Sequence, residues 1–256
     1  MKLTLTISEV KTQLKSLNHL DDPLVAELRT DTRKGVQSAL VAFEKRIQKQ
    51  IIAKEAFEKR FKYEKSFWST GNQYVAGMDE VGRGPLAGPV VTAAVILDES
   101  FDLIGVTDSK LLTANEREHL YLKIIEEAIE VNICVKDRDF IDQHNIYHAT
   151  QLAMIETIQG LQHQPTQIIV DAVPLDLNIP QTTLIKGDQK SISVAAASIL
   201  AKEYRDHLMD TYDKVYPGYD FAHNKGYGTA KHLAGLKQLG ITPIHRMSFS
   251  PVPEYK

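Results

Sequence analysis

Two apolar segments of the chain are joined by Gly77-Met78-Asp79-Glu80-Val81-Gly82-Arg83-Gly84-Pro85-Leu86-Ala87-Gly88-Pro89-Val90. The residues Tyr74–Met78 lead into this stretch, and the β-branched and apolar residues Val90–Leu97 follow it. Glycine and proline interrupt regular structure and are typical of turns, so the stretch predicts an antiparallel pair of strands. The acidic pair Asp79-Glu80 then stands at the end of the first strand.

Downstream of this pair, short apolar segments alternate with longer segments of helical periodicity. The predicted strands are Val131–Lys136, Gln167–Asp171 and Thr182–Ile185. The predicted helices are Thr113–Ile129, which opens on a capping box, then Asp139–Gln162, Ser191–Tyr212 and Thr229–Leu239. Strands that come first as a hairpin and later alternate with helices predict an α/β fold, a mixed sheet flanked by helices with a helical C-terminal part.

The N-terminal residues 1–70 have a different pattern and predict helices only. Ser8 is a plausible N-cap for a helix over Glu9–Leu20, and Pro23 suits the first turn of the next helix. A long helix is predicted from about Val36 to Phe67, with Asp31 or Thr32 as its cap. The linker-like residues 69–72 follow. We therefore expect a helical extension over residues 1–70 with a role in substrate binding, and a sheet-containing domain over residues 71–256.

Charge is distributed unevenly between these two parts. Residues 1–70 hold 14 Lys and Arg against 9 Asp and Glu, whereas the rest of the chain holds 16 against 24. The net charge of −3 thus combines a basic extension with an acidic body. In the long helix, basic residues mix with aromatic ones between Phe43 and Tyr63. This mixture suits a solvated amphipathic helix with ion pairs and equally suits a helix that contacts the phosphates of a nucleic acid.

Several protein classes are disfavoured by composition. No apolar run approaches the roughly 20 residues of a membrane span, and Met1–Val10 lacks the apolar core of a signal peptide. The single cysteine, Cys134, excludes an internal disulfide, and we expect it to be buried in a strand. The nine histidines have no metal-ligand spacing with cysteine, and we expect most of them at the surface or in loops. We expect a cytoplasmic monomer with no membrane partner.

Four carboxylates stand out because each follows or ends a predicted strand: Asp79, Glu80, Asp171 and Asp188. If they converge at one edge of the sheet, their mutual repulsion is relieved by cations between them. Oxygen ligands without cysteine suit Mg²⁺ or Mn²⁺, and two such ions about 4 Å apart clamp both oxygens of a phosphodiester displacement. Acids at strand ends are also common as helix caps, and Asp188 could cap the helix that starts at Ser191. The residues alone leave both interpretations open.

Over residues 72–252 the chain resembles the ribonuclease HII family. The quoted stretch from Gly77 to Val90 matches the family's signature segment, and further matching segments follow in the same order. They are Asp108-Ser109-Lys110, Ile169-Val170-Asp171, Lys186-Gly187-Asp188, Ser193-Val194-Ala195-Ala196-Ala197-Ser198-Ile199-Leu200-Ala201-Lys202, Asn224-Lys225-Gly226-Tyr227-Gly228-Thr229 and His245-Arg246 with Ser248-Phe249. Residues 1–70 are similar to an extension found on some bacterial members.

The resemblance implies a fold, a reaction and roles for particular residues. It implies the ribonuclease H fold and hydrolysis with two metal ions, Mg²⁺ or Mn²⁺, held by the catalytic Asp79, Glu80, Asp171 and Asp188. It implies as substrates RNA/DNA hybrids and duplex DNA that contains ribonucleotides, which would be cut on the 5′ side of the ribonucleotide. The implied substrate-binding residues are the 2′-hydroxyl sensor Gly82-Arg83-Gly84, Tyr227, which packs on the following sugar, and Lys110 and Lys202, which hold phosphates.

Three rival interpretations have distinguishing features. A ribonuclease HIII-like hybrid nuclease without single-ribonucleotide activity is expected to carry another glycine loop and an N-terminal domain with a sheet. A junction resolvase or transposase-like nuclease of the same fold would lack the sensor loop with Tyr227. A catalytically inactive nucleic-acid-binding module would have lost at least one of the four acids, and all four are present.

Overall fold

The computed structural model describes residues 5–256, which form two compact units, residues 5–58 and residues 59–256. The first four residues of Met1–Val10, the segment in which we expect no signal peptide, lie outside the described part of the chain. Among the helices of residues 5–256, none combines the length and the apolar character that a bilayer crossing requires.

The first unit contains α1 (Ile7–Ser16), α2 (Pro23–Leu28) and most of α3 (Lys34–Arg60). Thr6, not Ser8, is the N-cap of α1, because its hydroxyl accepts from the Glu9 amide while Glu9 accepts from the Thr6 amide. This capping box starts the helix earlier than expected. The core of the unit consists of Val10, Leu14, Val25, Leu28, Val36, Leu40, Phe43 and Ile47.

The long helix predicted from Val36 to Phe67 is wrong at its C-terminal end. Helix α3 ends at Arg60, the backbone of Phe61 turns to a ψ of 0°, and α4 (Lys62–Trp68) begins. The aromatic residues Tyr63, Phe67 and Trp68 of α4 pack against the sheet of the second unit. Nothing in the local sequence breaks the helix, so tertiary packing sets this boundary.

The second unit is built on a five-stranded mixed sheet of order β3-β2-β1-β4-β5. The strands are β1 (Val75–Val81), β2 (Val90–Ile96), β3 (Glu130–Lys136), β4 (Gln167–Asp171) and β5 (Gln181–Leu184). Strands β1, β2 and β3 pair antiparallel, whereas β4 and β5 run parallel to β1. The predicted hairpin and the mixed α/β sheet are therefore confirmed, and Cys134 is buried in β3 as expected.

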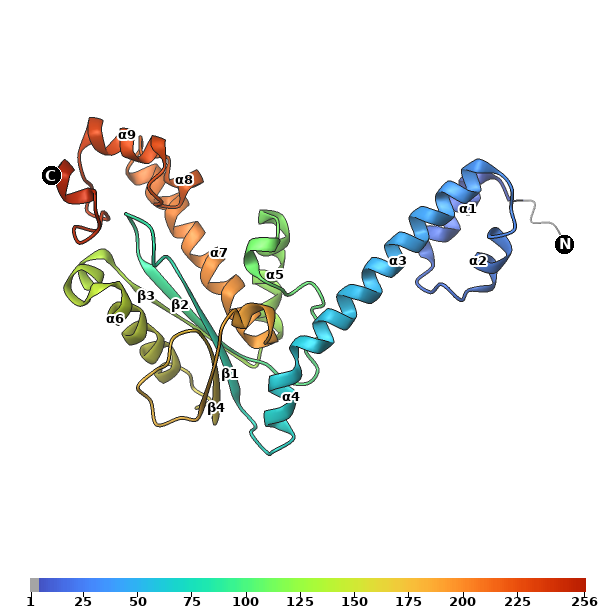
Figure 1. The fold of residues 1–256 in the computed structure, drawn as a ribbon, viewed down its shortest axis with the longest axis horizontal. Helices are drawn as coiled ribbons and strands as arrows, with labels where there is room; N and C mark the ends of the chain where they lie inside the picture. The colour runs from blue at the N-terminus through green and yellow to red at the C-terminus, as the bar shows by residue number, and fades with distance from the viewer. Residues whose placement is uncertain (1–4) are drawn as a thin grey trace. The chain divides into compact units, whose positions relative to one another are not determined.

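Two helices cover the two faces of this sheet, α6 (Arg138–Gln159) and α7 (Ile192–Val215) (Figure 1). Because side chains alternate along a strand, Ala76 and Met78 of β1 pack with α6. Val75 packs with Val194 of α7, and Gly77 lies on the same face. A Cβ atom at Gly77 would lie 2.3 Å from the backbone carbon of Ser193. The glycine therefore lets the start of α7 approach β1 closely.

The remaining elements complete the second unit. Helix α5 (Ala114–Glu127) opens on the predicted capping box of Thr113 and Glu116. Helix α6 starts after its N-cap Asp137 and is interrupted at Asn145, where φ is +58°. Helices α8 (Phe221–Asn224) and α9 (Ala230–Leu239) form the helical C-terminal part with the 3₁₀ helix η3 (Val252–Tyr255). Its core consists of Leu86, Ala87, Met209, Tyr219, Phe221, Leu236 and Val252.

Candidate active site

Asp79 and Asp171 lie side by side at the carboxyl end of the parallel strands. The last paired residues of β1 and β4 are Met78 and Val170, so each acid is the next residue on its strand. We expected Asp79 and Glu80 at the end of the first strand, but β1 continues to Val81 because its pairing with β2 extends further. At Asp79 and Glu80, β1 still pairs with β2 on one side, whereas its pairing with β4 on the other side has ended.

Asp188 reaches the same region from a short connection after β5. The connection holds Lys186 in the left-handed conformation and forms a 3₁₀ helix, η2 (Gly187–Gln189). The backbone N–H of Gly187 donates to the Asp171 carboxylate at 2.9 Å, which ties this connection to β4. Ser191, not Asp188, is the N-cap of α7. The capping interpretation of Asp188 is therefore wrong, and its buried carboxylate needs another explanation.

The four carboxylates act on one another electrostatically. Burial, followed by the charge of Glu80, raises the pKa of Asp79 well above its ordinary value, and Asp171 adds to this rise. Burial also raises the pKa of Glu80, against the lowering effect of Arg83, whose guanidinium lies 3.2 Å from a Glu80 oxygen. Burial raises the pKa of Asp188, with contributions from Asp108 and Asp171. Clustered acids of this kind favour cation binding.

Two further residues, Asp108 and Ser198, lie beside these acids. Asp108 is buried, and its carboxylate raises the pKa of Asp188. Ser198 of α7 donates a hydrogen bond to Asp79 and lies 3.1 Å from the hydroxyl of Ser109. Both residues belong to sequence segments that match the family. Their position beside the four acids, however, becomes evident only in the fold.

The glycine loop and Tyr227 come together although they are far apart in sequence. A Cβ atom at Gly84 would lie 3.4 Å from the Tyr227 ring, and the backbone N–H of Leu86 donates to the Gly226 carbonyl at 2.8 Å. Gly82 has a φ of +90°, a conformation that favours glycine. The Tyr227 side chain is 49% exposed, so its ring is available to a ligand.

The two lysines differ in their surroundings. Lys110 is exposed, and its charge lowers the pKa of Asp188, so it lies close to the acids. Lys202 of α7 instead forms an ion pair at 2.7 Å with Asp206, one turn further along the same helix. The structure therefore brings Lys110, and not the ammonium of Lys202, into electrostatic contact with the predicted site.

A different group of side chains has the closest metal-ligand spacing. Within residues 5–256, one carboxylate or imidazole atom from each of Glu118, Glu203 and His207 lies within 4.8 Å of the others. Arg117 already forms an ion pair with Glu203, so the charge of this group is partly compensated. The four predicted acids do not meet this spacing among the described residues.

Most histidines are exposed, as expected, and two are exceptions. His232 and His245 are fully buried, and their Nε2 atoms lie 2.9 Å apart. Burial lowers the pKa of His245 to about 4, and the neighbouring His232 adds to this effect. Their remaining ring nitrogens bond to the Tyr227 carbonyl and to Thr242. They are structural residues beneath Tyr227.

Comparisons with known proteins agree along the whole chain. The family described as Ribonuclease HII matches residues 76–252, and Ribonuclease HII N-terminal domain matches residues 6–68. A protein of Limosilactobacillus reuteri named Ribonuclease HII is 65% identical over 250 residues, which covers 98% of each chain. One of Limosilactobacillus fermentum with the same name is 62% identical over the same share of each chain.

Solved structures support the fold. The ribonuclease H2 of Pyrococcus horikoshii superimposes with a TM-score of 0.61 at 27% identity, covering 72% of this chain and 97% of that one. A Bst-RNase HIII structure in complex with Mn²⁺ gives a TM-score of 0.55, covering 72% of this chain and 70% of its own; at 19% identity this likeness concerns the fold alone.

The sheet order, the helices on both faces and these neighbours define a protein of the ribonuclease H-like fold. Within that class the sequence matches are specific. The chain belongs to the ribonuclease HII family.

Proposed function

We propose that this protein is an endonuclease that hydrolyses the RNA strand of RNA/DNA hybrids and cuts 5′ of single ribonucleotides embedded in duplex DNA. The observation that carries this proposal is the proximity of Asp79, Glu80, Asp171 and Asp188 at one end of the sheet, in a chain of this family. Cleavage would leave a 3′-hydroxyl and a 5′-phosphate.

The donor set fits divalent cations. All four side chains offer carboxylate oxygens, and the second oxygen of Glu80 is buried without a hydrogen-bond partner among the described residues. Buried acceptors without a donor are costly unless a cation or water meets them. Two Mg²⁺ or Mn²⁺ ions held by these acids would supply positive charge to the attacking water and to the departing oxygen of a phosphodiester.

The surrounding side chains orient the acids. The Ser198 hydroxyl and the Glu80 amide both donate to Asp79, the latter at 2.8 Å, so this carboxylate is held from two directions. The Gly187 amide holds Asp171, and Arg83 pairs with Glu80. Preorganised ligands of this kind need little rearrangement when the substrate binds.

Recognition of a ribonucleotide is assigned to Gly82-Arg83-Gly84 together with Tyr227. The 2′-hydroxyl is the group by which a protein separates RNA from DNA at one nucleotide. Backbone groups can approach it closely where side chains are absent, as at Gly82 and Gly84. The exposed Tyr227 ring beside Gly84 provides an apolar surface for the adjoining sugar. Lys110 is proposed to hold a phosphate near Asp188, and the same role for Lys202 requires release from Asp206.

The ribonuclease HIII-like alternative has less support. It is expected to carry a different glycine loop and an N-terminal domain with a sheet. Residues 5–58 contain helices and no strand. Since solved structures of both kinds share the fold, fold likeness does not separate them. Cleavage of a long hybrid without cleavage at a single ribonucleotide would support this alternative.

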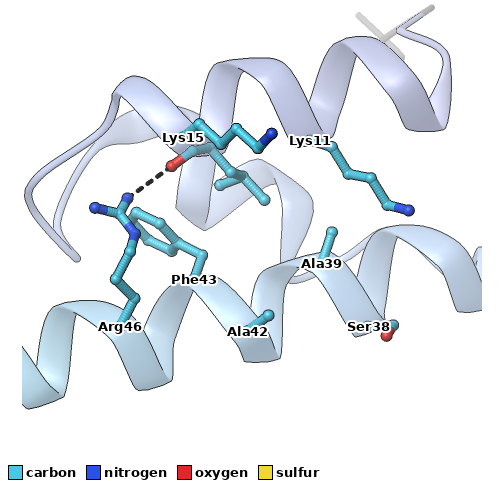
Figure 2. Close-up of a pocket in the computed structure, with 8 residues that line it drawn as sticks. Lys11, Lys15, Ser38, Ala39, Ala42, Phe43 and Arg46 are labelled. Carbon is cyan, nitrogen blue, oxygen red and sulfur yellow. Dashed lines mark hydrogen bonds between the residues drawn. The ribbon is translucent and has the colours of Figure 1, made fainter. Parts of the chain in front are cut away.

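The N-terminal unit is proposed to strengthen substrate binding. A groove of about 460 Å³ lies between α1 and α3, and Lys11, Lys15 and Arg46 line it together with Leu14, Ser38, Ala39, Ala42 and Phe43 (Figure 2). No acidic residue is among those lining residues. The Arg46 guanidinium donates to the carbonyls of Leu14 and Leu17, so it also fixes the end of α1. Such a surface suits a phosphodiester backbone.

The cellular setting is part of the proposal. Burial raises the pKa of the Cys134 thiol to about 11, so the single cysteine is poorly suited to oxidation or metal binding. The proposed enzyme is a monomer and acts in the cytoplasm.

A labelled RNA/DNA hybrid tests the nuclease activity. We expect cleavage in Mg²⁺ or Mn²⁺ with 5′-phosphate ends, no cleavage in EDTA, and none by Asp79→Asn. Asp21→Asn, which removes an exposed carboxylate in the N-terminal unit, should cleave like the wild type. Cleavage in EDTA, or near-normal turnover by Asp79→Asn, would refute the metal assignment.

A further inference from the structure

Two arginines in the second unit are buried without an acidic partner. Arg205 of α7 is 1% exposed and Arg246, which precedes η3, is 0% exposed. Neither forms an ion pair with another residue of the described chain 5–256, although burying an unpaired charge is costly. Burial lowers the pKa of Arg205 to about 10 and that of Arg246 to about 9, so both remain charged at neutral pH. The cost of burying these two charges raises the question of what the arginines do in the fold.

Both guanidinium groups bind backbone carbonyls. Arg246 donates to the carbonyl oxygens of Gly82 at 2.6 Å, Arg83 at 3.1 Å and Gly88 at 2.9 Å. The planar guanidinium can reach three acceptors at once because its five N–H groups have fixed directions. The ring of Phe249 lies 5.0 Å from the Arg246 guanidinium and packs against it.

Arg205 holds the same loop from α7. It donates to the carbonyl oxygens of Pro89 at 2.8 Å and Ala87 at 3.1 Å, and to that of Lys225 at 2.8 Å. The Lys225 carbonyl belongs to the segment that carries Tyr227. Arg205 thus joins the glycine loop to the tyrosine segment through one side chain.

The loop is shaped around these arginines. Gly82 and Gly88 both have positive φ, and a Cβ atom at Gly82 would lie 2.3 Å from Nε of Arg205. A Cβ atom at Gly226 would lie 2.3 Å from the Ala87 carbonyl oxygen. Any side chain at these positions would separate the loop from the arginine or from the tyrosine segment. The two arginines therefore hold the loop on both sides of Gly84 and the backbone of Lys225, two residues before Tyr227.

We propose that Arg246 and Arg205 are positioning residues for ribonucleotide discrimination, which hold the carbonyls of residues 82–89 so that Gly84 and Tyr227 meet one sugar. This inference depends on the proposed function of that loop. The arginines do not contact the substrate in this scheme. Loss of either arginine would loosen the relative positions of Gly84 and Tyr227. This should matter most for a substrate with a single 2′-hydroxyl, because a long hybrid offers many ribonucleotides that can bind.

The test compares two substrates in the full-length enzyme. For Arg246→Lys, which keeps the charge and loses the planar fork, we expect kcat/KM on a duplex with one ribonucleotide to fall at least about tenfold more than kcat/KM on a long hybrid. Arg117→Lys is the matched control, because Arg117 is a mostly buried arginine that pairs with Glu203 and Asp206 away from the loop. It should lower both values by the same factor.

Milder variants keep the test decisive if Arg246→Lys folds poorly. Arg205→Lys and Phe249→Leu should change the ratio in the same direction, the latter by removing the ring that packs on Arg246. An unchanged ratio in the folded variants, with the wild type active on both substrates, overturns this inference alone. Failure of the wild type to cut the single-ribonucleotide duplex overturns the proposed function and this inference with it.

Discussion

Asp79 illustrates what the site requires of a single residue. Its carboxylate is buried, accepts hydrogen bonds from Ser198 and the Glu80 amide, and lies within the electrostatic reach of two other acids. The hydrogen bonds favour the charged form, whereas burial and the neighbouring charges disfavour it by more. Without a cation the ionised residue therefore costs stability, and a cation removes that cost.

A metal titration of thermal stability measures this balance without any cleavage assay. In divalent-free buffer at neutral pH, Asp79→Asn should melt at the same temperature as the wild type or higher. Saturating Mn²⁺ at about a hundred times its Kd should raise the wild-type Tm by roughly 5–10 °C and the variant's by much less. Because protons compete for carboxylates whose pKa values are raised, the metal-induced rise should shrink as pH falls. An equal rise in both proteins would contradict the assignment.

At the scale of elements, the start of α7 is the junction on which the site depends. Gly77 lets α7 approach β1, and Glu64 of α4 accepts from the Ser191 hydroxyl at 2.5 Å, the Ser193 hydroxyl at 2.6 Å and the Ser193 amide at 3.1 Å. Glu64 is 0% exposed. A carboxylate at a helix N-terminus satisfies free N–H groups and complements the helix dipole. Helix α4 thereby fixes the helix that carries Ser198.

Replacement of Glu64 separates its hydrogen bonds from its charge. Glu64→Ala should lower the free energy of unfolding by about 2–4 kcal/mol, since buried donors lose their acceptor and a cavity forms. Glu64→Gln keeps an acceptor and should stay within about 1 kcal/mol of the wild type. Denaturant titrations of both variants measure this, with Glu55→Gln at an exposed position as the control.

The pH dependence gives an independent check. Burial raises the pKa of Glu64 in the folded state, so the folded protein binds a proton that the unfolded chain has released. Wild-type stability relative to Glu64→Gln should therefore decline as pH rises above the unfolded pKa of about 4.3. A relative gain over that range would mean that the ionised carboxylate is stabilised at this junction.

At the scale of the whole molecule, the chain combines a basic N-terminal part with an acidic body. Four of the acidic residues of the body, Asp79, Glu80, Asp171 and Asp188, are the proposed metal ligands at the end of the sheet. The basic groove of residues 5–58 offers the opposite charge to a polyanion. Binding and catalysis would then be distributed between the two units.

A charge reversal in the groove tests this distribution. Lys11→Glu with Lys15→Glu should weaken hybrid binding at moderate salt by about tenfold or more and reduce the salt dependence of binding, because phosphate contacts are lost. The value of kcat at saturating substrate should not change. Lys49→Glu with Lys54→Glu makes the same charge change on exposed residues outside the groove and should have a smaller effect. Equal losses in the two double variants would refute a specific groove.

Parts of the fold could be predicted from sequence because local patterns determine them. The hairpin around Asp79, the order of strands and helices and the capping box at Thr113 all follow from periodicity and turn residues. The break at Phe61 could not be predicted, because the packing of α4 on the sheet causes it. The continuation of β1 past Asp79 depends on how far β2 pairs with it, which is also a tertiary property.

The acids of the candidate site could be predicted from the sequence, whereas the buried arginines around its glycine loop could not. Acids that follow apolar strands can be located in the sequence, and parallel strands bring their ends together. Arg246 belongs to a segment that matches the family and Arg205 does not, but the burial of neither could be predicted, because an arginine in a helix or loop is usually a surface cation. Six carbonyl oxygens from distant segments converge on them only after folding. Most histidines are exposed as predicted, and which two are buried, His232 and His245, also depends on the fold.

The most direct test is cleavage of a labelled DNA duplex that contains one ribonucleotide, with an all-DNA duplex and a long RNA/DNA hybrid as controls, in Mg²⁺ and in Mn²⁺. The wild-type protein should cut on the 5′ side of the ribonucleotide, cut the hybrid and leave the all-DNA duplex intact. Cleavage of the hybrid alone would contradict the assignment of Gly82-Arg83-Gly84 and favour the ribonuclease HIII-like alternative. A folded protein that cuts neither ribonucleotide-containing substrate would contradict the proposed nuclease activity itself.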